Sequence, residues 1–402
     1  MFPAAASRLP VTSRRLGRVA LACSVVAGLS AGLSACGGGS RNSYFSPSRV
    51  VSFGDENSAI DAFSSGSLLD SSGAGNVASV KGLTYTVHTV ITDSTPVVCQ
   101  QKTPAGLCDA GGGTFGTLAS AAHYSFSDTS STFLELDAGS PVMQRTTTTL
   151  YRCDYATIWV QTIARAYGRG FNTQCPLETN SGAVSHATYG ATSDDVIAQI
   201  NAHRGELGSG VLVTIMAGQH DILQQYAAIR GSSTSETAAI GELQARADRM
   251  TAAVRDVIGT GAKVVLALTP SLNNSPMGVS AGEDTALLSR LMVAYNDRLY
   301  VRGLGNVSGR DLVGVNPDTF TNTSTRSTAY VHSTALCNTT GLSKPDGTLT
   351  TGAASDVRFC TTDTLVSGGS TSTYMWADNT HFAPLGHSLI GTLGFNRARQ
   401  QF

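Results

Sequence analysis

Four side chains capable of acid–base chemistry lie in short polar segments of the sequence. Glu56 and His220 each closely follow an apolar run, and Asp378 and His381 lie three residues apart near the C-terminus. A carboxylate beside an imidazole can orient it as a general base toward a nucleophile. Two imidazoles with carboxylates can also ligate zinc or iron. These residue types therefore predict an acid–base or metal-binding centre, provided that the fold brings them together.

The elements that must position these side chains are predicted from apolar runs that end in turn residues. Continuous runs of this kind are typical of strands that are covered on both faces of a parallel sheet. Strands are expected at residues 49–53, 211–216, 263–268 and 311–315. Because ligands of such sheets bind beyond the carboxyl ends of the strands, the polar residues that follow the runs are expected to meet at one edge.

Helical patterns alternate with these strands. The most regular one covers about 236–258, where apolar residues recur at steps of three and four. Further helices are expected from Ser193, at about 283–301 and after Pro384. The alternation predicts a parallel sheet with helices on both faces. Residues 66–150 break this rhythm, are rich in Ser, Thr and Gly, and predict a small β-rich insertion.

The polar segments, taken in order, resemble the motifs of the SGNH/GDSL hydrolases. That family has F-G-D-S-x-S near the N-terminus, then a block with a single Gly, then G-x-N-D, and finally D-x-x-H near the C-terminus. Here residues 53–58 read F-G-D-E-N-S, Gly190 stands in the second block, residues 218–221 read G-Q-H-D, and residues 378–381 read D-N-T-H. The resemblance covers about 48–395 and implies a three-layer α/β/α, flavodoxin-like fold.

The resemblance also implies roles for these positions. In the family, the Ser attacks an ester carbonyl, the His takes its proton, and the Asp orients that His, while backbone N–H groups and the Asn hold the oxyanion. Asp378 and His381 match, and Gly190 matches as an oxyanion donor. Glu56 replaces the nucleophilic Ser, and His220 replaces the Asn. The resemblance therefore implies a carboxylester hydrolase with a small ester or acyl substrate and no cofactor, whose activity is weak or lost.

The replacement of Ser by Glu56 leaves other hypotheses open. A Glu beside His381 would form an ion pair and raise the imidazole pKa, which favours a non-catalytic binding or scaffold protein on the same fold. Ser58 is an alternative nucleophile, although two helical residues would rotate its side chain by about 200°. A metal site built from Glu56, His220 and His381 is a third hypothesis, whereas the leading hypothesis includes no metal.

Residues 1–35 have the pattern of an export signal. Four arginines and no acid accompany an apolar run at 19–33, which is too short and too rich in small residues for a membrane span. The run ends in L-S-A-C at Cys36, which resembles a bacterial lipobox, so Cys36 is expected to carry a lipid. Residues 36–47 predict a flexible tether and residues 48–402 the globular domain. We expect an exported protein, anchored by its lipid to the cell envelope at the outer membrane.

Composition and cysteine usage agree with an exported globular domain. The formal net charge of −1 gives no basic field that would attract nucleic acid. Beyond Cys23 and Cys36, six cysteines remain, and an even number in an oxidising compartment indicates disulfides. The sequence alone does not determine which cysteines pair, nor the oligomeric state. It contains no Cys-x-x-Cys motif of the kind that indicates a zinc site. The pairs expected are those that close short loops: Cys99–Cys108, Cys153–Cys175 and Cys337–Cys360.

Overall fold

In a computed structural model of the chain, the described residues belong to the unit Phe45–Phe402. They exclude residues 65–67, 70–74, 77–78, 100, 103–107, 110–131, 135–141, 281, 323–326, 341, 344–348 and 351–355, and the side chains of 63–80, 90–151 and 343–350. The expectations for the export signal, for lipidation of Cys36 and for the tether at 36–44 therefore fall outside the described part of the chain. So does the expected Cys99–Cys108 disulfide.

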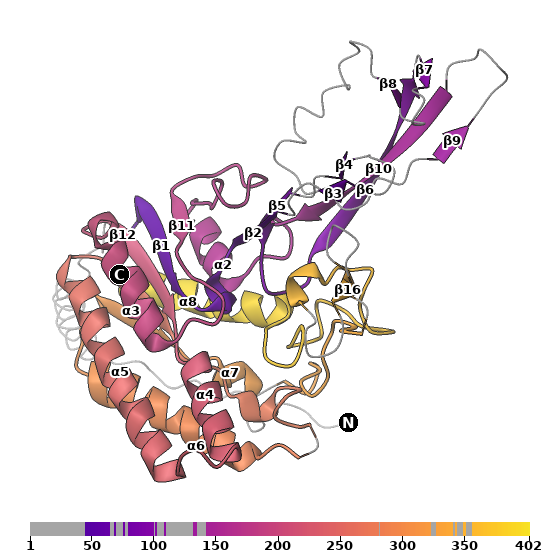
Figure 1. The fold of residues 1–402 in the computed structure, drawn as a ribbon. Coiled ribbons are helices and arrows are strands. Elements are labelled where there is room, and N and C mark those ends of the chain that lie inside the picture. The colour runs from indigo at the N-terminus through magenta and orange to yellow at the C-terminus, as the bar shows by residue number, and fades with distance from the viewer. Residues whose placement is uncertain are drawn as a thin grey trace, which may run out of the picture. The chain divides into compact units, whose positions relative to one another are not determined.

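A five-stranded parallel sheet forms the centre of this unit (Figure 1). Its order is β11 (Ala183–Ser185), β1 (Arg49–Gly54), β12 (Val211–Met216), β13 (Lys263–Ala267) and β14 (Leu312–Val315). The register runs from Arg49 opposite Val211 to Gly54 opposite Met216, so β1 and β12 end side by side. All four predicted strands are confirmed. The short edge strand β11 was not expected, because three residues give too little pattern to recognise.

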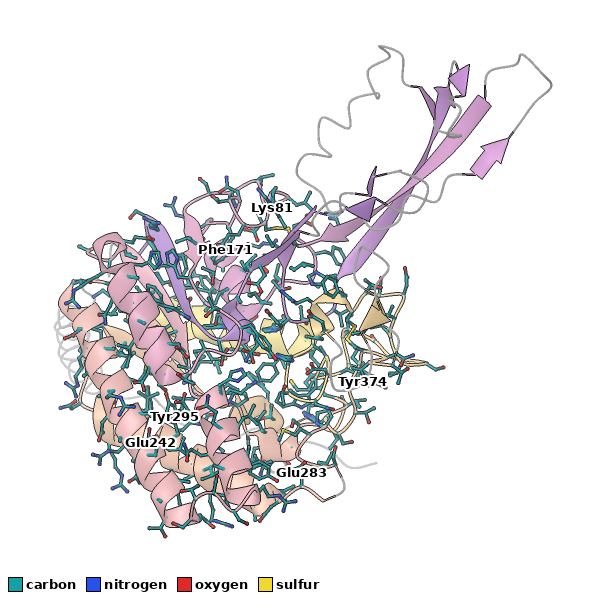
Figure 2. All side chains as sticks on the ribbon, viewed as in Figure 1. Lys81, Phe171, Glu242, Glu283, Tyr295 and Tyr374 are labelled. Carbon is teal, nitrogen blue, oxygen red and sulfur yellow. A yellow bond between two sulfur atoms is a disulfide. The ribbon has the colours of Figure 1, made fainter. Side chains whose placement is uncertain are left out.

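Helices cover both faces of the sheet, as the alternating pattern predicts. One layer contains α3 (Ser193–Ala202), α4 (Gln219–Arg230), α5 (Glu236–Gly259) and α6 (Thr285–Asn296), and the other contains α2 (Trp159–Ala166) and α8 (Pro384–Gln401). Successive strand residues face opposite layers: Val213 packs with the first layer and Leu212 with the second. Tyr295 and Phe171, both labelled in Figure 2, are fully buried in these two cores. The three-layer α/β/α fold is therefore confirmed.

Side-chain caps explain where several of these helices begin. Thr192 accepts a hydrogen bond from the Asp195 backbone N–H at the start of α3, and Ser235 accepts one from the Ala238 N–H at the start of α5. Each such cap stabilises its helix by about 1 kcal/mol. The helix expected at about 283–301 begins at Thr285, and from Asp297 it continues as the wider π-helical segment η5 (Asp297–Leu304).

The β-rich insertion is present as antiparallel pairs. β6 (Thr89–Cys99) pairs with β10 (Val142–Arg152) along its full length, and β9 (Thr132–Leu134) pairs with the other edge of β10. Smaller pairs join β2 (Asp61–Ser64) to β5 (Ser79–Leu83), β3 (Leu68–Leu69) to β4 (Gly75–Asn76), and β7 (Gln101–Lys102) to β8 (Cys108–Asp109). Outside the insertion, β15 (Leu342–Ser343) pairs with β16 (Leu349–Thr350). Short helices are η1 (Glu56–Ser58), η3 (Arg204–Glu206), η4 (Leu272–Asn274), α7 (Asp318–Thr321) and η7 (Val357–Phe359).

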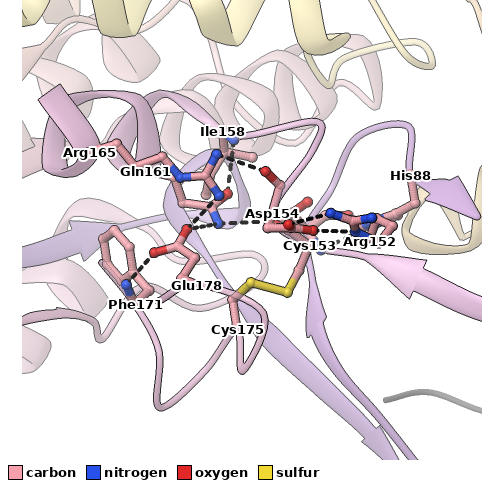
Figure 3. The surroundings of a disulfide bond; sticks show 11 residues. His88, Arg152, Cys153, Asp154, Ile158, Gln161, Arg165, Phe171, Cys175 and Glu178 are labelled. Carbon is pink, nitrogen blue, oxygen red and sulfur yellow. Dashed lines mark hydrogen bonds and ion pairs between the residues drawn. A yellow bond between two sulfur atoms is a disulfide. The ribbon is translucent and has the colours of Figure 1, made fainter. Parts of the chain in front are cut away.

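Two of the expected disulfides are present, Cys153–Cys175 and Cys337–Cys360. Beside the first, the buried carboxylate of Glu178 accepts hydrogen bonds from Gln161 at 2.8 Å and from Arg165 at 3.0 Å (Figure 3). This network ties α2 to the loop that carries Cys175. None of the helices in the described part of the chain combines the length and the apolar character that crossing a bilayer requires.

Candidate active site

The carboxyl end of β1 turns sharply into η1, and this turn positions Glu56. Gly54 has φ +148°, and a Cβ there would lie 2.4 Å from the Met216 carbonyl oxygen, so only glycine fits. Asp55 then caps η1, and its Oδ1 accepts hydrogen bonds from the Asn57 backbone N–H at 3.1 Å and from Asn57 Nδ2 at 3.2 Å. The turn places the Glu56 side chain, which is 1% exposed, beyond the end of the strand.

The Glu56 carboxylate lies at the centre of a set of donors from three other segments. His220 Nε2 lies 2.7 Å from Oε1 and 2.8 Å from Oε2. The Gly190 backbone N–H donates to Oε2 at 3.0 Å, and Gln219 Nε2 donates to Oε1 at 3.4 Å. His381 Nε2 lies 3.3 Å from Oε1, within ion-pair distance but without the alignment of a hydrogen bond. The structure thus brings Glu56, Gly190, His220 and His381 together.

Asp378 and His381 form the second half of the site, in the segment that precedes α8. His381 Nδ1 lies 2.7 Å from Asp378 Oδ2, and the other oxygen, Oδ1, accepts hydrogen bonds from the backbone N–H groups of Thr380 and His381 at 2.9 and 2.8 Å. These bonds fix the carboxylate, which in turn orients the imidazole so that Nε2 faces Glu56. This is the arrangement of an Asp–His pair that assists a nucleophile, with a carboxylate in the nucleophile's place.

The charges of the four groups alternate through the site. Burial raises the pKa of Glu56, but the interactions with His220 and His381 outweigh it and hold that pKa well below its usual value. Burial lowers the pKa of His381, but Asp378 and Glu56 raise it well above 6.5, and the pKa of His220 is also raised, against the effect of burial, by Glu56. An imidazole that keeps its proton at neutral pH cannot act as a general base.

Two neighbouring features also influence the ionisation of these groups. Burial, and then the negative charge of Glu56, raise the pKa of Asp55 to about 7. His220 lies in the first turn of α4, where the helix dipole disfavours a cation, so the Glu56 carboxylate is the group that stabilises its charge. α4 can begin at this point because Gly218 has φ +112° and a Cβ there would lie 2.3 Å from the Tyr295 ring.

The structure does not bring Ser58 to the imidazole. Its hydroxyl is fully buried and accepts a hydrogen bond from Trp159 Nε1 at 3.1 Å, on the side of the sheet that α2 covers. Trp159 belongs to the core of that layer. The placement agrees with the rotation expected for a residue two positions after Glu56.

Two tyrosines beside the site were not anticipated as functional residues. The Tyr85 ring lies 5.7 Å from the His381 ring, and Tyr189 stacks on Tyr85 at 5.2 Å and meets His220 edge-on at 5.9 Å. Tyr85 is buried and Tyr189 is 63% exposed, so the pair extends from the site to the surface. The one feature of the sequence that could have indicated this placement is that Tyr189 directly precedes Gly190.

Side chains close enough to share one metal ion occur elsewhere in the described part of the chain. The ligand atoms of one such group, His186, His203 and Glu206, all lie within 4.8 Å of one another. Among the described residues, Glu56, His220 and His381 do not meet this criterion. Neither His186 nor His203 could be assigned a partner from the sequence. The one available signal was the spacing of His203 and Glu206, which matches one helical turn.

Comparisons with known proteins give lipases and other hydrolases among solved structures. The sequence matches no protein-family profile and no curated protein. A lipase from a goat rumen metagenome is 12% identical, with a TM-score of 0.37, over 62% of this chain and 90% of that one. An extracellular lipase from Streptomyces rimosus is 14% identical, with a TM-score of 0.31, over 56% of this chain and 83% of that one.

A third solved structure is an alpha/beta hydrolase from the metagenome of Lake Arreo, Spain. It is 18% identical, with a TM-score of 0.22, over 32% of this chain and 52% of that one. At such TM-scores these likenesses carry no argument about activity. The fold class rests on the parallel sheet and its two helical layers.

Proposed function

We propose that the chain is a cell-envelope lipoprotein of the SGNH/GDSL hydrolase type whose altered site hydrolyses carboxylesters weakly or not at all. The observation that carries this proposal is the position of the Glu56 carboxylate, which stands where the family has its serine and binds the Gly190 N–H at 3.0 Å. In this interpretation the carboxylate occupies donors that would otherwise stabilise an oxyanion.

Three physical arguments support weak or absent turnover. A carboxylate that attacked an ester would form an anhydride, which is a poor intermediate for simple hydrolysis. His381 holds its proton between Asp378 and Glu56, so it cannot take a proton from a nucleophile. His220 stands in the place of the family's oxyanion Asn, and its Nε2 is engaged by both oxygens of Glu56.

The same site can serve ligand binding without hydrolysis, which is the second candidate function. The Tyr85–Tyr189 stack provides an apolar wall beside the cationic imidazoles of His220 and His381. A small ligand with an acyl chain and a polar head would match this combination of surfaces. In both candidates the membrane is reached through a lipid on Cys36, which a Cys36→Ala variant tests by loss of palmitate labelling.

Restoring the family's residues tests the proposal. Glu56→Ser with His220→Asn supplies a hydroxyl and an amide donor, and it removes one of the two anions that raise the pKa of His381. Native protein is expected to hydrolyse p-nitrophenyl butyrate no faster than background, and the double variant should show clear turnover. Glu56→Ser alone should be slower than the double variant by about 10²-fold, because one oxyanion donor is missing.

A third variant controls for non-specific hydrolysis. Adding His381→Ala to the double variant should remove the new turnover, since no base then remains beside the introduced hydroxyl. Ester hydrolysis by the native chain that Glu56→Ser abolishes would contradict the proposal and would give Glu56 a direct catalytic role.

A further inference from the structure

A second carboxylate between two imidazoles lies on the β11 side of the sheet. His186 follows β11, His203 ends α3, and Glu206 lies in η3. His186 Nε2 is 3.1 Å from Glu206 Oε2, and His203 Nδ1 is 2.9 Å from Oε1. The two imidazole rings stack with their centroids 3.4 Å apart and their planes 8° from parallel. One nitrogen of each ring therefore meets one oxygen of a single carboxylate.

These side chains lie close enough together to share one metal ion. Zinc binds imidazole nitrogen and carboxylate oxygen at about 2.0–2.2 Å, so neighbouring ligand atoms lie about 3.3–3.6 Å apart in its tetrahedral shell. The observed nitrogen–oxygen separations of 2.9 and 3.1 Å are hydrogen-bond distances, and the same atoms would move apart by several tenths of an ångström around an ion. The His203 side chain is 36% exposed, so its ring has room to turn out of the stack until one nitrogen of each ring points at the same ion, with a further position open to water.

The surroundings keep the ligands in place. Arg49 NH2 lies 2.7 Å from Glu206 Oε2, which holds the carboxylate, and the His186 ring stacks on Phe53 at 5.7 Å. Supporting contacts to ligand side chains strengthen metal binding.

We propose that His186, His203 and Glu206 form a binding site for a divalent transition-metal ion of the zinc type. The donor set of two imidazoles and one carboxylate suits such an ion better than Mg²⁺ or Ca²⁺, which prefer oxygen ligands. The site joins the two ends of the segment 186–206. Gly190 and Tyr189 lie within this segment, so the ion would hold the chain that carries the Gly190 N–H in place.

Zinc titration of the native chain tests the site. After treatment with chelator and dialysis, isothermal titration calorimetry with ZnCl₂ should show one saturable site per chain that excess MgCl₂ does not block. His203→Ala and Glu206→Gln should each weaken binding by more than about 100-fold, beyond the cost of losing a supporting contact. Hydrogen exchange should slow in residues 186–206 of the native chain when zinc is added.

Two control variants locate the effect. Glu242→Gln makes the same change of charge on a partly exposed glutamate of α5 that pairs with Arg246, and it should leave zinc binding unchanged. His220→Asn should also bind one zinc, because His220 lies in the other cluster. Absence of zinc binding by the native chain, or equal binding by native protein and folded His203→Ala, would overturn the proposal. Neither result bears on Glu56, so the proposed function is tested separately.

Discussion

In the part of the chain that the structure describes, two clusters each place one glutamate between two histidines, and their surroundings give them opposite character. Glu56 lies between His220 and His381 with its side chain 1% exposed, whereas Glu206 lies between His186 and His203 with its side chain 24% exposed. Identical residue types therefore do not define a function. Burial and the neighbouring charges raise the pKa of His381 and lower that of His186.

The charged residue that lies next to each cluster has the opposite sign in the two cases. Asp378 adds a second negative charge behind His381 and raises its pKa, so the Glu56 cluster becomes an alternating row of ions. Arg49 adds a positive charge beside Glu206, and it contributes to lowering the pKa of His186, after burial and the nearby His203. The first cluster is consequently a closed set of ion pairs, whereas in the partly exposed second cluster one carboxylate is shared by Arg49 and two imidazoles.

The largest expected difference between the clusters is in stability. Glu56→Gln removes a buried charge that two cationic imidazoles require, so the free energy of unfolding should fall by about 3 kcal/mol near neutral pH. The same change in the partly exposed cluster, Glu206→Gln, should cost less than about 1 kcal/mol, because solvent screens the pair. Urea unfolding of both variants measures the two losses on one scale.

Both variants replace Glu by Gln, which has nearly the same shape and differs in charge and hydrogen bonding. The comparison therefore isolates the effect of the lost charge. Circular dichroism of each variant at low urea establishes that both are folded. Similar losses for Glu56→Gln and Glu206→Gln would show that burial does not separate the clusters and would remove the basis of the comparison.

The two clusters are also expected to change the free energy of unfolding with pH in opposite directions, by a smaller amount than the glutamate substitutions. The pKa of His220 is raised from 6.5, so its contribution to stability is fully present below pH 6.5 and is lost as pH rises through its folded-state pKa. The pKa of His186 is lowered from 6.5, so the folded state loses stability as pH falls below 6.5 toward its folded-state pKa.

Unfolding of histidine variants between about pH 5 and pH 9 measures this difference. His220→Gln should be most damaging, relative to native protein, at the acidic end, and its cost should shrink as pH rises. His186→Gln should reduce the loss of stability that acid causes. Parallel pH profiles for the two variants would contradict the assigned difference in protonation.

Much of the fold could be predicted from the sequence because its signals are local. The runs that became β1, β12, β13 and β14 are continuous and apolar, and the regular spacing of α5 marks a helix without reference to other segments. The meeting of Glu56, His220 and His381 was also predictable, since the resemblance supplies the order of the motifs and parallel strands end at one edge.

The rest depended on contacts that no local pattern encodes. The His186–His203–Glu206 cluster forms only because β11 pairs with β1 and brings His186 beside the end of α3. The Tyr85–Tyr189 stack joins a residue that follows β5 to one that precedes α3. Such pairs are set by the tertiary fold, so residue types alone could not reveal them.

The protonation state of His381 tests the central claim most directly. If Glu56 is an ionised partner that prevents His381 from acting as a base, ¹⁵N NMR of histidine-labelled native protein should show both His381 ring nitrogens still protonated at pH values well above the ordinary pKa of 6.5. In Glu56→Gln the same ring should lose a proton at lower pH. A native His381 that titrates at or below its ordinary pKa would contradict the claim, because a free base would then face Glu56.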